Sequence, residues 1–204
     1  IKSESLTYTE NLDKTLLTEP SVALTAILTV VTNESRALLK HVNALLSQNG
    51  DLHRINLVEM QTALDETHAY VDLIHLDKTG SPQWQQLVAA IHLLDHLQRL
   101  HERCDEEEYR AFAAKQNEDL NSIVKQFIMA IEQMFANIDK QKWQENAKLA
   151  SAANKALLAQ LAPVRDEVMS NIAVGHITVP QATQRAEAIR WLKRVSYHIS
   201  RITH

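Results

Sequence analysis

Apolar residues recur at intervals of three and four positions over most of the chain, which is the spacing of one face of an α-helix. In the first half this pattern predicts three helices. They are separated by Asn49-Gly50-Asp51, which is a stop, turn and cap, and by Gly80-Ser81-Pro82. In the second segment Gly80 ends one helix, and Ser81 followed by Pro82 begins the next. The three predicted helices cover 20–48, 55–79 and 82–104.

The second half of the chain repeats this organisation, with helices predicted over 120–138, 147–172 and 180–202. Pro163 falls inside the second of these, where it either kinks the helix or marks a boundary, and Gly175 ends that helix. We therefore expect an all-α fold of six helices in two repeated three-helix bundles. The first bundle and the N-terminal flank take in 1–108, and the second bundle takes in 109–204.

The amino-acid composition agrees with an all-helical fold. Charge and missing motifs argue against two classes of function, nucleic-acid binding and catalysis. Glycine and proline are scarce and aromatic residues make up 5% of the chain. The net charge is −4 and the basic residues are scattered, so nucleic acid is not an expected partner. There is no glycine-rich phosphate loop, G-x-S-x-G or H-E-x-x-H motif, so an enzyme is not expected. A single cysteine, Cys104, excludes an intrachain disulfide, and its position on an apolar stripe predicts a buried structural thiol.

Two segments carry a family resemblance. The stretch NLDKTLLTEPSVALTAI, from Asn11 to Ile27, resembles the junction that opens the cytoplasmic region of bacterial Na⁺/phosphate cotransporter-family proteins, and AIRWLKRVSYHISRITH, from Ala188 to His204, is similar to the closing helix of that region. The third predicted helices of the two halves also resemble each other, in LQRLHER and LKRVSYH.

This resemblance implies a PhoU-like regulatory or structural domain at the cytoplasmic face of the bacterial inner membrane. A membrane transport domain of the same chain would then be its main partner and would carry phosphate flux. The chain begins at Ile1 rather than methionine, so we expect it to be a piece of a longer protein.

The family resemblance also implies a metal motif, E-x-x-x-D, on the third helix of each bundle. Residues four apart share a helix face, so two carboxylates converge on one cation. The matching positions here are Gln98 and Glu102 in the first half and Lys193 and Tyr197 in the second. Because only one of the four is a carboxylate and Lys193 is itself a cation, we expect no metal and no other cofactor.

Two histidine patterns give weaker metal candidates. Asp65, His68, Asp72 and His75 repeat D-x-x-H at the edge of an apolar stripe of the second predicted helix, but no facing E-x-x-H completes a di-iron set. His92 and His96 have the i, i+4 spacing of zinc ligands without a third ligand nearby, on a face predicted to be solvated. In both cases polar residues that edge a core are the favoured interpretation.

Several alternatives stay open at this point. A freestanding metal-binding PhoU-type regulator of phosphate uptake or signalling is the leading one, and a di-metal helical-bundle enzyme is a third. Homodimerisation is a further expectation. The acidic run 105–108 and the basic last helix are each interpreted as solvated faces, and the basic helix could instead meet anionic lipid.

Overall fold

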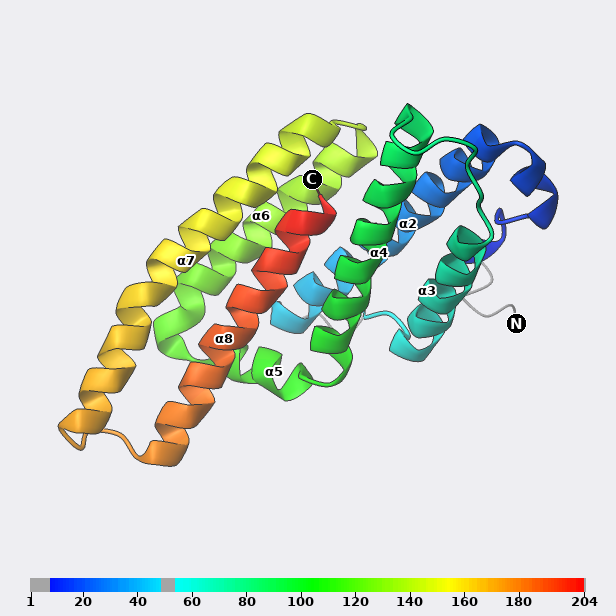
Figure 1. Ribbon diagram of the computed structural model, residues 1–204. Coiled ribbons are helices and arrows are strands. Elements are labelled where there is room, and N and C mark those ends of the chain that lie inside the picture. The colour runs from blue at the N-terminus through cyan, green and yellow to red at the C-terminus, as the bar shows by residue number, and fades with distance from the viewer. Residues whose placement is uncertain (1–7, 49–53, 204) are drawn as a thin grey trace. The chain divides into compact units, whose positions relative to one another are not determined.

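The computed structural model describes residues 8–48 and 54–203, and over these residues the chain is all-helical, with no strand (Figure 1). The predicted all-α class is therefore confirmed. The described elements are the 3₁₀ helices η1 (Lys14–Thr18) and η3 (Glu118–Leu120) and the α-helices α2 (Pro20–Leu46), α3 (Leu57–Asp72), α4 (Pro82–Asp105), α5 (Glu108–Gln116), α6 (Asn121–Asp139), α7 (Trp143–Ala173) and α8 (Val179–Ile202).

Three of these helices start within one residue of the predicted position. Helix α2 begins at Pro20, whose missing N–H suits a first helical turn. Ser81 Oγ accepts from Trp84 N at 3.1 Å at the start of α4. Thr178 and Gln181 form a reciprocal capping box at the start of α8. The predicted turn at 49–51 lies outside the described residues.

The structure differs from the predicted helices at α5, at the end of α3 and at the start of α7, which begins at Trp143 and not near 147. Helix α5 was not predicted, because it is only 9 residues long and too short to show a repeating apolar face. Helix α3 ends at Asp72 and not near 79, because Leu73 and Ile74 tighten the last turn by bonding three residues back, to Tyr70 and Val71. Pro163 lies inside a continuous α7 and marks no boundary.

The described residues fall into two compact units. Unit 1 takes its residues from 1–38 and 55–101, and unit 2 from 39–54 and 102–204. This grouping differs from the predicted halves, since 39–54, which includes the end of α2, goes with the second unit. The division into two three-helix bundles remains a prediction.

Unit 1 has an aliphatic core drawn from α2, α3 and α4, with polar bonds that join α3 to both other helices. Thr67 on α3 bonds Glu34 on α2, and Gln61 on α3 bonds Gln98 on α4. The largest fully buried side chains of the core are Leu24, Ile27, Leu38, Met60, Leu64, Leu94, Leu97 and Leu100. Burial of this apolar surface is the main force that holds the three helices together.

Unit 2 is built on the packing of α7 against α8 and α6, with α5 lying across α8. Its largest fully buried side chain is Trp191 on α8, whose indole Nε1 donates to the Arg103 carbonyl at 2.9 Å. Arg103 lies in the last turn of α4, where carbonyls have no partner within the helix. Trp191 therefore both fills the core and caps the end of α4.

Among the described residues one helix, α2, is long and apolar enough by length and composition to cross a membrane. The core helix of a soluble protein passes the same test, and half of the most apolar stretch of α2 is buried within the fold. The sequence contains no unbroken run of about eighteen apolar residues, the length that a membrane span requires. We treat α2 as a core helix of the two units.

Candidate functional site

The four positions that match the family's metal motif carry other interactions. Gln98 and Gln61 exchange two amide hydrogen bonds of 2.9 Å, so the Gln98 side chain is fully engaged across α3 and α4. Glu102 is half-buried, Tyr197 is 49% exposed with its ring edge-on to His198, and Lys193 lines a hollow between α7 and α8. Over residues 8–48 and 54–203, no group of three or more His, Cys, Asp and Glu side chains is arranged to hold a metal ion.

The sequence predicted that the two D-x-x-H pairs lie on one helix, and the structure shows that they do not. Asp65 and His68 lie on α3, whereas His75 follows the end of that helix at Asp72. Both aspartates and His75 are exposed, and Asp65 accepts a hydrogen bond from Gln61 at 2.9 Å. These four residues therefore edge unit 1 without converging on one point.

The His92–Cys104 stretch of α4 separates into an outer and an inner face. His92 is exposed and His96 half-buried, as expected for a solvated edge. Cys104 is fully buried, and burial, together with the charges of Asp105 and Glu108, raises the pKa of its thiol to about 12. His101, which the sequence did not single out, is buried with Nε2 2.6 Å from the Leu57 carbonyl at the start of α3.

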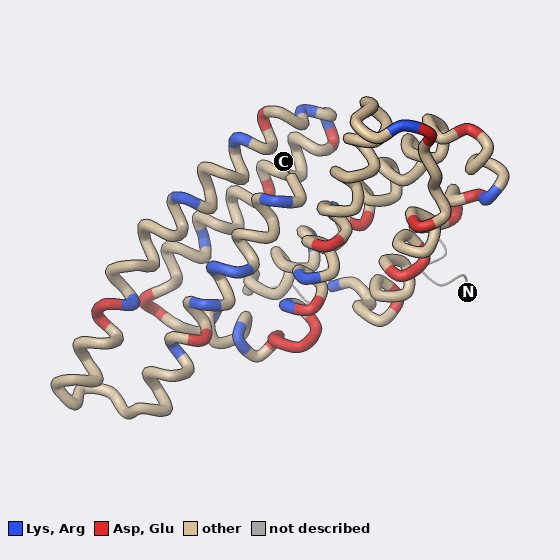
Figure 2. The backbone as a smooth tube through the Cα atoms, viewed as in Figure 1, with Lys and Arg blue, Asp and Glu red and all other residues tan. Residues whose placement is uncertain are grey.

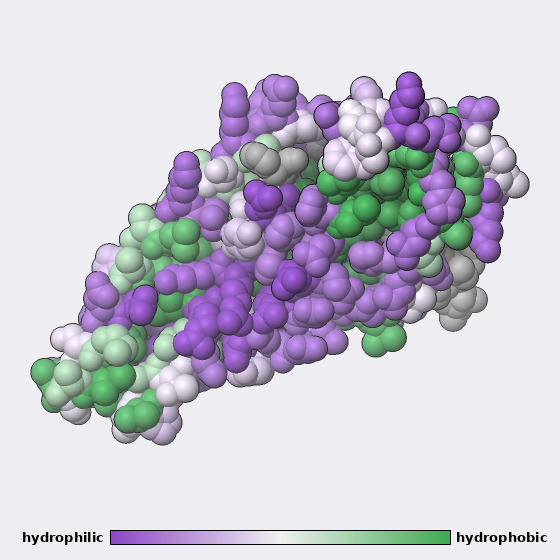
Figure 3. Space-filling model, viewed as in Figure 1, coloured by the Kyte–Doolittle hydropathy of each residue, from purple (hydrophilic) through white to green (hydrophobic). Residues whose placement is uncertain are grey.

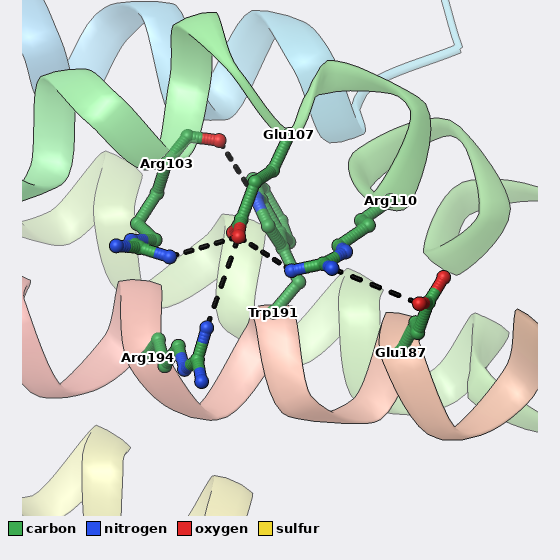
Figure 4. Close-up of polar contacts among 6 residues, drawn as sticks. All are labelled: Arg103, Glu107, Arg110, Glu187, Trp191 and Arg194. Atoms are coloured by element: carbon green, nitrogen blue, oxygen red, sulfur yellow. Dashed lines mark hydrogen bonds and ion pairs between the residues drawn. The ribbon is translucent and has the colours of Figure 1, made fainter. Parts of the chain in front are cut away.

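The acidic run and the basic last helix are not two separate solvated faces, contrary to the sequence interpretation. Glu107 is buried between three guanidinium groups, from Arg103 at 2.8 Å, Arg194 at 3.7 Å and Arg110 (Figure 4). Arg110 also reaches Glu187 on α8 at 3.7 Å. This network joins the end of α4, the start of α5 and the middle of α8 within unit 2.

A buried carboxyl group occupies the middle of α2 in unit 1. Glu34 is 0% exposed, its Oε1 lies 2.9 Å from Thr67 Oγ1, and its Oε2 has no hydrogen-bond partner among the described residues. Burial raises the pKa of Glu34 to about 8, against the opposing effect of the Thr67 bond, and the charge of Glu66 adds to the rise. Glu34 is therefore a neutral acid at neutral pH.

The segment that precedes α2 is fastened to α3. Thr9 Oγ1 donates to the Glu66 carboxylate, and the Tyr70 hydroxyl donates to the Asp13 carbonyl at 2.8 Å. The Asp13 side chain caps η1 by accepting from Thr15 N at 2.8 Å. We call residues 9–19, with their contacts to α3, the junction. Glu66 both holds the junction and acts on the ionisation of Glu34.

Among the described residues, these groups provide a buried carboxyl group that can bind a proton and a junction that is fastened to α3. The chain matches no protein-family model, no curated protein and no solved structure.

Proposed function

We propose that this chain is a PhoU-like cytoplasmic domain of a bacterial Na⁺/phosphate cotransporter-family membrane protein, with a regulatory or structural role. In this proposal a membrane domain of the same chain carries phosphate. The role needs no catalytic group and no resident metal.

The observation that supports this proposal is the fastening of the junction to α3. Residues 11–19 of the junction fall within the segment whose sequence resembles the opening of the family's cytoplasmic region, and Thr9 lies just before it. A domain that regulates a membrane partner needs a firm connection at that point, because a loose linker would transmit no change in conformation. Here the Tyr70–Asp13 and Thr9–Glu66 bonds fix the junction to the same helix that contacts Glu34 through Thr67.

These contacts give a physical route for regulation. A change in the protonation or packing of Glu34 acts on Thr67 and Glu66, which lie next to each other on α3. Glu66 then acts on Thr9 in the junction. The regulated quantity in this proposal is the position of the junction relative to α3.

The test uses the complete gene product that contains this sequence, reconstituted in proteoliposomes, with sodium-dependent uptake of radiolabelled phosphate as the readout. We expect sodium-dependent uptake, and a changed rate in Tyr70→Phe, which removes the bond to Asp13. Tyr109→Phe is the matched control, because Tyr109 is 58% exposed and lies on α5 in unit 2.

Two results would count against the proposal in different ways. Absence of sodium-dependent uptake by the complete protein would overturn the assignment to a phosphate transporter. Normal uptake that is equally unaffected by Tyr70→Phe and Tyr109→Phe would overturn regulation through the junction. Elemental analysis that finds about one transition metal per chain would favour the alternative of a metal-binding regulator.

A further inference from the structure

A hollow of about 320 Å³ lies between residues 165–169 of α7 and residues 186–193 of α8 in unit 2. Its floor is apolar and includes Val168, Met169 and Ile189. Three cations, Arg165, Arg190 and Lys193, complete its lining, and no carboxylate of the described residues takes part. A hollow with an apolar floor and a cationic rim is complementary to an amphiphile with an anionic head.

Arg165, Arg190 and Lys193 have no ion-pair partner among the described residues, unlike Arg110 on α5 and Arg185 and Arg194 on α8. Arg110 and Arg194 are paired with Glu107, and Arg185 lies 3.9 Å from Asp119. None of Arg165, Arg190 and Lys193 forms an ion pair with a residue that the structure describes. Their positive charge is therefore available to an external anion.

The end of the α7–α8 hairpin next to this hollow is apolar and uncharged. From Val168 to Gln184 the sequence contains no Asp, Glu, Lys or Arg. Met169, Val174 and Val179 are 60%, 62% and 67% exposed. Figure 2 shows no charged position at this end of the hairpin, and Figure 3 shows apolar surface there. We call residues 168–184 the hairpin tip.

We infer that the hairpin tip and the adjoining hollow bind an anionic phospholipid surface. The apolar tip enters the boundary between headgroups and acyl chains, and the three cations behind it meet lipid phosphates, which is the order that a membrane interface imposes. A second copy of the chain fits this surface poorly, because a two-fold interface would bring the same unpaired cations against each other.

The test is sedimentation of the purified 204-residue chain with vesicles, and it needs no transport activity. The inference therefore stands or falls separately from the proposed function. We expect binding to vesicles of equimolar phosphatidylglycerol and phosphatidylcholine, and none to pure phosphatidylcholine.

Two sets of variants separate the contributions of charge and of the apolar tip. Arg165→Gln with Arg190→Gln and Lys193→Gln should lower the partition coefficient by a factor on the order of 100, since each basic residue near an anionic surface contributes to binding. Lys125→Gln with Lys148→Gln and Lys155→Gln removes the same charge from exposed positions of α6 and α7 outside the hollow, and should change binding by less than about three-fold. Val174→Ser with Val179→Ser should weaken binding without lowering the melting temperature, because both side chains are already exposed.

Four outcomes would overturn the inference. The first is equal binding to both kinds of vesicle, and the second is no binding to either. The third is an equal loss of binding in the variant of the hollow (Arg165, Arg190 and Lys193) and in the control variant (Lys125, Lys148 and Lys155). The fourth is full binding by the Val174 and Val179 double variant. Inorganic phosphate forms a separate arm. Release of the chain from vesicles by millimolar phosphate, with a matching rise in melting temperature that the Arg165, Arg190 and Lys193 variant lacks, would show that free phosphate is the ligand and would also overturn the assignment to lipid.

Discussion

The Thr67 hydroxyl lies 2.9 Å from Glu34 Oε1 and also 2.9 Å from the Ala63 carbonyl. A threonine hydroxyl has one proton to donate, so it cannot serve both acceptors at once. If Thr67 donates to Ala63, as helical threonines commonly do to the residue four before them, the carboxyl of Glu34 must supply the other hydrogen. With Glu34 protonated, both contacts of the Thr67 hydroxyl can form at the same time, which agrees with the raised pKa of this acid.

The first prediction concerns pH. Because the pKa of Glu34 is raised from 4.5 to about 8, the folded chain binds more protons than the unfolded chain across that window. The contribution of Glu34 to the free energy of unfolding therefore falls as pH rises, by up to about 1.4 kcal/mol per pH unit, and levels off above about pH 8. Glu34→Gln should abolish this slope in denaturant titrations between pH 5 and 8.5, whereas Glu132→Gln, at an exposed position of α6, should retain it. Parallel curves for wild type and Glu34→Gln would contradict the assignment.

The second prediction concerns the partner of this acid. Thr67→Val keeps the shape of the side chain but leaves Glu34 Oε1 without its bond, so we expect a loss of about 1–3 kcal/mol in the free energy of unfolding. Thr67→Ser should restore most of it. Urea denaturation at pH 6 measures both variants, and equal stabilities for Val and Ser would show that the hydroxyl contributes nothing.

The third prediction concerns the indole that caps α4. Trp191→Phe removes the bond to the Arg103 carbonyl and leaves a cavity in the core of unit 2, so stability should fall by about 2–4 kcal/mol. Trp84→Phe is the matched control, because Trp84 is 38% exposed, and it should change stability by less than about 0.5 kcal/mol. Thermal unfolding followed by circular dichroism distinguishes the two, and similar losses would argue against the capping role.

The fourth prediction concerns the ion-pair network. Glu107→Gln leaves three guanidinium groups around a neutral amide, and their repulsion should lower stability by about 2–4 kcal/mol. The neighbouring Glu106→Gln changes an exposed carboxylate and should have little effect. Adding Arg194→Gln to Glu107→Gln should recover part of the loss. If the double variant lost more free energy of unfolding than the two single variants added together, repulsion between the guanidinium groups would not be the cause.

The fifth prediction concerns metal. A chelator should leave the melting temperature unchanged, because Gln98 is engaged with Gln61 and Lys193 places a cation at the second motif position. Lys193→Glu with Tyr197→Asp restores E-x-x-x-D and should make stability respond to added divalent or ferric ions. A fall of several degrees in wild type on chelation, reversed by metal, would show that other residues bind a metal.

Local signals account for the parts of the fold that could be predicted from sequence. Pro20 and the Ser81 cap mark the starts of α2 and α4, as predicted. Helix α8 begins at Val179, one residue before the predicted range, and its Thr178 cap was not predicted. Helix α5 escaped prediction because its nine residues complete fewer than three turns.

The polar groups inside the two units show why the candidate sites were harder to predict. Glu34 follows Ile27 and Val31 at helical spacing and precedes Leu38, so its place on the buried face could have been found from the pattern. The pairing of Glu107 with Arg194 could not, because it depends on α8 returning to the end of α4 across more than eighty residues of chain.

The loop that joins α7 to α8 is already ordered before anything binds to it. Val174, Gly175 and His176 donate backbone hydrogen bonds back to the last turn of α7, with Gly175 at a φ of +75°, and the Thr178 backbone N–H donates to the Gln181 side chain. Ordering a flexible loop costs about 1–2 kcal/mol of backbone entropy per residue, and a ligand that binds this tip is spared most of that loss. Replacing Gly175 by a β-branched residue would strain the turn. A resulting fall in vesicle affinity would measure how much the pre-ordered loop lowers the backbone entropy lost on binding.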